Sequence, residues 1–303
     1  MAQCLKPFFV KQNSDSMLVP CGRCPNCLRR RASAWSFRLM EEEKISTSAH
    51  FITLTYDTKH VPISRNGYLS CCKRDLQLFF KRLRKAQGKS SAVPIRYYAV
   101  GEYGGQTQRP HYHIILFNAE LELIPQAWAK VDRSTGEFNM IGDIHYGDVS
   151  VKSVGYTLKY ISKPKSKIGR TRNDDREPQF SLMSKGLGET YLGDFIRVDR
   201  KKVWIEQSNI VKWHRDDLGN RMYLNLTDGK KCSMPRYYKD KLYTDDERKM
   251  IADASRDKFV EDILKQLFKL DAKANIREQH NKKESVHAAY RKQIFFEKQL
   301  SKI

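Results

Sequence analysis

The chain has 303 residues, 40% hydrophobic and 11% aromatic, which is enough to build a core in one large domain or two modest ones. Lys and Arg number 56 against 35 Asp and Glu, and the net charge of +21 favours a polyanionic partner, most commonly nucleic acid, over a merely basic soluble protein. The basic residues are scattered rather than set on one amphipathic helix, which disfavours an anionic membrane surface.

No apolar run approaches the roughly 18 residues of a spanning helix, and the N-terminus lacks the apolar region of a signal peptide. We therefore expect a soluble, unsecreted protein with no membrane partner. Seven cysteines, an odd number, argue for metal binding or free thiols in a reducing compartment rather than for a disulfide framework.

Three of these cysteines form a compact motif, Cys21, Cys24 and Cys27, made of two successive Cys-x-x-Cys steps. Cys4 is available as a fourth ligand, and the four thiolates would close a tetrahedral zinc site. A closed shell leaves no open coordination position, so the expected role is to hold the N-terminal segment rather than to do chemistry. Ordinary reduced thiols and an iron–sulfur cluster are the alternatives, although nothing else in the sequence indicates electron transfer.

Hydrophobic periodicity predicts an alternation of helices and strands in the first third of the chain. For the first helix, contact with phosphates and a solvated face are equally good interpretations of its arginines. In the second helix, Ser70 is the expected N-cap and Gly88 the expected stop. The expected elements are a basic helix over 28–43, a buried strand over 50–57, an amphipathic helix over 73–86, a strand over 95–100 and a strand starting at 111.

The last two strands surround a glycine-rich turn and read as a hairpin. His111 and His113 point to the same face of the second strand because side chains alternate along a strand. Glu102 ends the facing strand, and it shares that face if it lies opposite either histidine. Two imidazoles and a carboxylate then form a site for a divalent cation. The register is decisive, since a slip of one residue turns Glu102 away.

Further along, a helix over 151–163 places Tyr156 and Tyr160 one turn apart on one face, with Lys159 beside them. Taken alone, tyrosines at this spacing are more often packing or surface residues than nucleophiles. A basic segment follows, which is either a solvated loop or a clamp on the DNA backbone. Its cations are Lys163, Lys165, Lys167, Arg170 and Arg172.

The remaining segments are less informative. The pattern predicts a short helix over 125–131, a strand over 141–149, a small β-rich extension over about 180–234 and helices from about 244 onward. The helical tail is expected to serve packing or oligomerisation. Together the segments predict an α+β fold with a ferredoxin-like antiparallel sheet and flanking helices. The expected domains are an N-terminal cysteine-knuckle segment with a basic helix (1–48), a core (49–175), a β-rich basic extension (176–243) and a C-terminal helical region (244–303).

The motif order resembles that of HUH endonucleases: a strand with alternating threonines (Thr53 and Thr55), His-x-His with an upstream glutamate, and a helix with Tyr-x-x-x-Tyr. The chain is most similar to the rolling-circle replication initiators of the Microviridae, of the gokushovirus type. The cysteine motif and residues 234–238 also resemble that family, so the resemblance extends to about residue 243. The residue between the two histidines is usually aliphatic in the family and is Tyr112 here. It points to the opposite face of the sheet, so metal binding is expected to survive.

The resemblance implies that Glu102, His111 and His113 hold Mg²⁺ or Mn²⁺. Tyr156 or Tyr160 would then attack the scissile phosphorus and form a 5′-phosphotyrosine. Lys159, or the metal, would favour the phenolate, because a free tyrosine with a pKa near 10 is a poor nucleophile. The implied activity is metal-dependent nicking and rejoining of single-stranded and replicative-form viral DNA at the origin. The setting would be the host bacterial cytoplasm, with host helicase and polymerase as further partners.

Two other interpretations of the sequence remain open. A small relaxase or a tyrosine transposase would use the same site on a different DNA, and the absence of a phosphate-binding helicase loop disfavours only the large relaxases. A protein of another class, a non-catalytic zinc-knuckle nucleic-acid-binding protein, would use the two histidines structurally.

Overall fold

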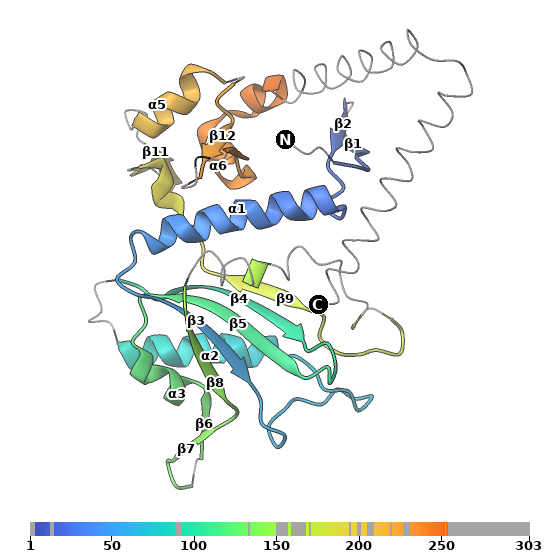
Figure 1. Ribbon diagram of the computed structural model, residues 1–303, viewed down its shortest axis with the longest axis vertical. Helices are drawn as coiled ribbons and strands as arrows, with labels where there is room; N and C mark the ends of the chain where they lie inside the picture. The colour runs from blue at the N-terminus through green and yellow to red at the C-terminus, as the bar shows by residue number, and fades with distance from the viewer. Residues whose placement is uncertain are drawn as a thin grey trace. The chain divides into compact units, whose positions relative to one another are not determined.

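The computed structural model of the chain (Figure 1) describes most residues up to 253. Those residues fall into two compact units, one over 31–189 and one combining 1–30 with 190–303, and each is described by itself. None of the helices in the described part is long and apolar enough to cross a membrane. The described ranges are 4–12, 15–88, 93–132, 134–149, 157–158, 168–169, 171–193, 195–198, 201–204, 209–218, 220–226, 229, 231–251 and 253.

The unit over 31–189 is built on a five-stranded sheet with strand order β8-β3-β5-β4-β9, in which every neighbouring pair is antiparallel. The α+β class with flanking helices is thereby confirmed. Its elements are α1 (Pro25–Glu43, here from Arg31), β3 (Ala49–Thr55), α2 (Lys73–Gln87), β4 (Arg96–Tyr103), β5 (Pro110–Phe117), the 3-10 helix η1 (Leu121–Leu123), α3 (Ile124–Ala127), β6 (Ala129–Val131), β7 (Phe138–Met140), β8 (Ile144–Asp148) and β9 (Phe180–Met183).

Each face of this sheet has its own hydrophobic core, because the buried strands are apolar on both sides. On one face α2 packs, and its fully buried Leu76 and Phe79 lie in one cluster with Ile52, Leu54 and Tyr112 (Figure 1). The other face is covered by α1. There a second cluster is formed by Leu39, Tyr98, Val100, Ile115, Phe117, Leu158 and Leu187.

Two local expectations about the helices were wrong. The N-cap of α2 is Cys72, whose sulfur accepts the N–H of Asp75 at 3.4 Å, while the Ser70 hydroxyl accepts the N–H of Glu177 at 3.0 Å. The expected helix over 125–131 ends early, and residues 129–131 pair with β7 as a strand instead. Local sequence did not reveal these partners, because Glu177 and β7 lie further along the chain.

The central sheet also extends into the part of the chain expected to form a separate β-rich extension. β9 adds to its edge by pairing with β4, for example Val100 with Ser181. The expected domain boundaries stay predictions, but this pairing ties residues 180–183 to the core sheet.

The second unit consists of small hairpins and short helices. One of its fully buried side chains is His214 on α5, so part of the expected β-rich extension is helical. The C-terminal residues 254–303, where a packing helix was expected, lie outside the described part. The unit's elements are β1 (Phe8–Gln12), β2 (Asp15–Val19), the start of α1, the 3-10 helix η2 (Glu189–Leu192), β10 (Phe195–Val198), β11 (Lys201–Trp204), α5 (Asn209–Asp216), β12 (Tyr223–Asn225), β13 (Lys231–Ser233) and α6 (Arg236–Leu242).

Candidate nicking site and cysteine cluster

The hairpin of β4 and β5 has the register that brings its three candidate ligands to one face. Glu102 pairs with His111, and Val100 pairs with His113. Directly opposed residues of an antiparallel pair point to the same face, and so do residues two apart on one strand. Glu102, His111 and His113 therefore share the face that α1 covers further along the sheet. Tyr112 points to the opposite face, where its hydroxyl accepts the N–H of Cys72 at 2.7 Å.

The glutamate and the second histidine are in direct contact. Glu102 Oε1 lies 3.0 Å from His113 Nε2, and the two residues are only 6% and 5% exposed. On the other side of the ring, Thr53 Oγ1 lies 3.0 Å from His113 Nδ1. Because the carboxylate can only accept, Nε2–H donates to Glu102 and Nδ1 accepts from the threonine hydroxyl. A buried carboxylate is thus held beside an imidazole whose orientation is determined from both sides.

His111 is more exposed, and a backbone carbonyl holds its ring. Its Nδ1 lies 2.8 Å from the carbonyl oxygen of Arg109, so Nδ1–H is the donor. The other ring nitrogen, Nε2, then carries a free lone pair, the arrangement usual for a metal-ligating histidine. The centroids of the two histidine rings are 6.4 Å apart. One carboxylate and two imidazoles suit a divalent cation such as Mg²⁺ or Mn²⁺, so these residues fit the metal that the sequence implies.

Two neighbouring strands supply side chains to the same face. Thr55 on β3 pairs with His111, and Thr53 pairs with His113. On its other side Thr53 pairs with His145 of β8, which is exposed. The threonines were visible in the sequence as an alternation within an apolar strand. His145 was missed, because a lone histidine on an edge strand carries no sequence signal and only the strand order places it in this row.

The proposed nucleophiles lie outside the described residues: Tyr156, Tyr160 and Lys159. So do Lys163, Lys165, Lys167 and Arg170, whereas Arg172 is described and exposed. Two residues between the tyrosines, Thr157 and Leu158, are described, and both are helical and buried. Leu158 packs with Val100 and Ile115, which stand on the same face as the histidines.

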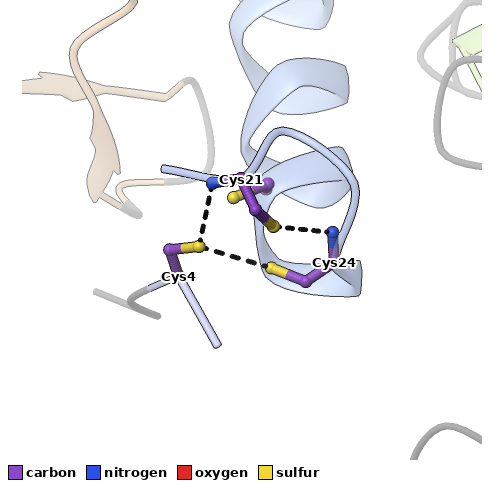
Figure 2. Close-up of side chains that lie close together, drawn as sticks. Cys4, Cys21 and Cys24 are labelled. Carbon is purple, nitrogen blue, oxygen red and sulfur yellow. Dashed lines mark hydrogen bonds between the residues drawn. The ribbon is translucent and has the colours of Figure 1, made fainter. Parts of the chain in front are cut away.

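The four N-terminal cysteines come together at the start of α1 in the second unit (Figure 2). Their sulfur atoms all lie within 4.8 Å of one another, and among the described residues only this group of potential ligands is so compact. Cys4 Sγ accepts the N–H of Cys21 at 3.2 Å and lies 3.9 Å from the sulfur of Cys24. Cys24 and Cys27 are buried. The group is able to hold a metal ion such as zinc.

Backbone donors and burial act in opposite directions on these thiols. The N–H of Arg23, which points at the sulfur of Cys21 from 3.4 Å, is the main cause that lowers the pKa of Cys21 to about 6. Burial raises the pKa of Cys27 to about 12, with the neighbouring Cys24 sulfur adding to the effect. One thiol is therefore readily ionised at neutral pH, and another keeps its proton unless a cation compensates for the negative charge.

Comparisons with known proteins agree with this arrangement. Residues 49–165, which contain the hairpin, match the family model of the replication-associated protein ORF2. The class is thus that of replication-associated proteins, and this region of the chain belongs to their ORF2 family.

Three relatives carry the comparison further. Replication-associated protein VP4 of Bdellovibrio phage phiMH2K is 29% identical over 76% of this chain and 69% of its own length. For ORF2 of Spiroplasma virus 4, the values are 28%, 64% and 61%. For ORF4 of Chlamydia phage 1, they are 24%, 79% and 56%. The chain is therefore related to replication-associated proteins of Microviridae, which confirms that resemblance. No solved structure matches the chain.

Proposed function

We propose that this protein initiates rolling-circle replication of a small single-stranded DNA phage by nicking and rejoining DNA at the origin. The observation that carries the proposal is the Glu102–His113 contact of 3.0 Å, with His111 on the same sheet face, inside the region matched by the replication-associated family. The antiparallel sheet with helices on both faces supports an HUH nuclease core of the ferredoxin-like kind.

In this proposal Glu102, His111 and His113 hold Mg²⁺ or Mn²⁺. A divalent cation at that position supplies Lewis-acid polarisation of the scissile phosphate. The residues around it do the positioning: Thr53 orients the His113 ring, and the Arg109 carbonyl orients the His111 ring. The low exposure of Glu102 keeps water away from the carboxylate, which strengthens its attraction to a cation.

The nucleophile is the phenolate oxygen of Tyr156 or Tyr160. It attacks the scissile phosphorus, a new O–P bond forms, and the bond from phosphorus to the 3′ oxygen breaks. The products are a 5′-phosphotyrosine and a free 3′-OH that primes synthesis. Because the covalent bond conserves the energy of the phosphodiester, a later attack by a 3′-OH rejoins the strand without ATP.

Two tyrosines one helical turn apart would allow successive cleavages, the second when the origin returns after one circle. Leu158 supports their placement near the metal ligands, because it lies between them in sequence and packs on the ligand-bearing face. Lys159 is proposed to favour the phenolate.

Binding of single-stranded and replicative-form DNA follows from the net charge of +21, since contacts from Lys and Arg to phosphates dominate affinity for DNA. We propose that the basic segment around Arg172 contributes such contacts, with the other cations named for it above. Replication in the host cytoplasm would also require the host helicase and polymerase.

For the cysteine cluster we propose a structural zinc ion bound by Cys4, Cys21, Cys24 and Cys27. Four sulfur ligands suit zinc and leave no open position for substrate. Its expected contribution is to tie the N-terminal segment to the start of α1.

The test is to incubate the full chain with origin-bearing single-stranded DNA and Mn²⁺, and to look for a protein–DNA adduct that resists denaturant. We expect an adduct at the 5′ side of the nick and a free 3′-OH on the released strand. Tight DNA binding without any adduct, across several candidate origins, would favour a non-catalytic DNA-binding protein. Sequencing the adduct then separates an origin-specific initiator from a relaxase or transposase acting on other DNA.

A further inference from the structure

Gln108 occupies an unusual position in the turn that leads into the histidine strand. Its φ angle is +52°, in the left-handed region that side-chain-bearing residues rarely adopt. Its side-chain oxygen accepts a hydrogen bond at 2.5 Å from Arg176 Nη1, a residue 68 positions further along the chain. A conformation of this kind persists where the surroundings determine it, and this hydrogen bond is such a restraint.

Arg176 is itself held firmly. Its Nε and Nη2 donate to the two carboxylate oxygens of Asp174 at 2.8 and 2.7 Å, and only 9% of the residue is exposed. The guanidinium carbon lies 5.0 and 5.4 Å from the ring centroids of Tyr68 and Tyr103. A guanidinium is a rigid planar fork, so fixing two of its nitrogens also fixes the direction of Nη1 toward Gln108.

The turn transmits this restraint to a proposed metal ligand. The N–H of Gln108 donates to the carbonyl of Gly104 at 3.1 Å, and the N–H of Gly104 donates to the carbonyl of Arg109 at 2.9 Å. The same Arg109 carbonyl accepts the Nδ1–H of His111 at 2.8 Å. The residue that follows Gln108 thus supplies the oxygen that orients the His111 ring.

We propose that Arg176 and Gln108 are positioning residues of the nicking site. They hold the Arg109 carbonyl in place, and this keeps His111 oriented with Nε2 available as a ligand. The inference rests on the proposed function of the Glu102, His111 and His113 group. Losing the outer partner of a ligating histidine typically weakens metal affinity by about 10–100-fold. Arg176 and Gln108 act one step further away, so we expect a change of about tenfold.

The test compares Gln108→Gly with Gln106→Gly in the full chain. Glycine accepts a positive φ, so Gln108→Gly removes the amide contact without straining the backbone. Gln106 is an exposed residue of the same turn and provides a matched control. Mn²⁺ binding is measured without DNA, by following the free-ion signal in electron paramagnetic resonance, with His113→Ala as the variant that lacks the site. Thermal melting is recorded for each variant.

We expect Gln108→Gly to bind Mn²⁺ about tenfold more weakly than Gln106→Gly, with the same melting temperature. Its nicking rate should recover at a correspondingly higher Mn²⁺ concentration. Equal affinities of the two glycine variants overturn the positioning role, and so does a loss of affinity that comes only with a lower melting temperature. If the wild-type chain binds no more Mn²⁺ than His113→Ala, the metal site of the proposed function is wrong instead.

A second variant, Arg176→Lys, keeps the positive charge but cannot bridge Asp174 and Gln108 as a fork. We expect a weakening of Mn²⁺ binding similar to that of Gln108→Gly, and no further weakening when the two changes are combined. Independent, multiplying effects would show that the two residues do not act through one contact, which contradicts the inference.

Discussion

Glu102 lies directly opposite His111 across the hairpin of β4 and β5, while its carboxylate reaches diagonally to His113 at 3.0 Å. One glutamate thereby stands between two histidines on a single sheet face. A slip of one residue in this hairpin would turn Glu102 to the α2 side, where the chain builds its larger hydrophobic cluster. The register therefore decides whether this part of the molecule can bind a cation.

The first prediction concerns the two histidines. His111→Ala and His113→Ala should each lower the nicking rate by more than about a hundredfold, because removing a ligand costs several kcal/mol of electrostatic stabilisation. DNA affinity, measured by fluorescence anisotropy, should change by less than about threefold, since phosphate contacts dominate binding. His145→Ala serves as the control, an exposed histidine in the same row of the sheet. Retained nicking in His113→Ala would remove that residue from the site.

The second prediction concerns the tyrosines. Tyr156→Phe and Tyr160→Phe should each retain some covalent adduct formation, and the double variant should form none, because phenylalanine lacks the attacking oxygen. Adducts are counted on denaturing gels with labelled single-stranded DNA. Tyr112→Phe is the matched control, since its hydroxyl lies on the opposite face, bonded to the backbone of Cys72. An adduct from the double variant would show that another residue is the nucleophile.

The third prediction is about the cysteine cluster. Purified wild-type protein should contain about one equivalent of zinc, and Cys4→Ser should contain much less, because only the folded chain brings Cys4 to the other three sulfur atoms. A chelator should lower the melting temperature of the wild-type chain and leave that of Cys4→Ser nearly unchanged. Cys232→Ser, which alters a cysteine outside the cluster, should behave as wild type. Zinc well below one equivalent in the wild type would rule out the structural zinc site.

The fourth prediction is a pH dependence of stability in the second unit. His214 is fully buried; its Nδ1–H donates to the Arg221 carbonyl at 2.8 Å, and its Nε2 lies 3.0 Å from the Tyr191 hydroxyl. Burial lowers the pKa of His214, and the nearby positive charge of Arg221 adds to this. The folded chain therefore binds a proton less readily than the unfolded chain. Stability should be fully present above about pH 6.5, the ordinary histidine pKa, and should fall as the pH is lowered below it.

The measurement is urea denaturation between about pH 5 and 7.5, with a slope of at most about 1.4 kcal/mol per pH unit from this one group. His214→Gln keeps a donor and an acceptor but does not titrate, so its stability should depend less on pH over this interval. An unchanged slope in His214→Gln would mean that other groups cause the pH dependence.

Much of the architecture followed from local patterns in the sequence. Alternation predicted the strand around Thr53 and the histidine strand, and the helical stripe of Leu76, Phe79 and Leu83 predicted α2 to within one residue at its end. The Cys-x-x-Cys steps predicted the cysteine cluster, because three of its four members are close in sequence. These features depend on side chains within a few positions of one another, so the sequence by itself determined them.

Other features depended on which distant segments meet. Strand order placed His145 beside Thr53, and the pairing of β9 with β4 carried the sheet to residues 180–183. Glu177, far along the chain, took the Ser70 hydroxyl that was expected to cap α2. The hydrogen bond from Arg176 to Gln108 likewise joins segments that no periodicity connects. Composition and spacing determined the chemistry available to this protein, and tertiary structure decided which groups stand next to one another, because register and strand order are set by long-range packing.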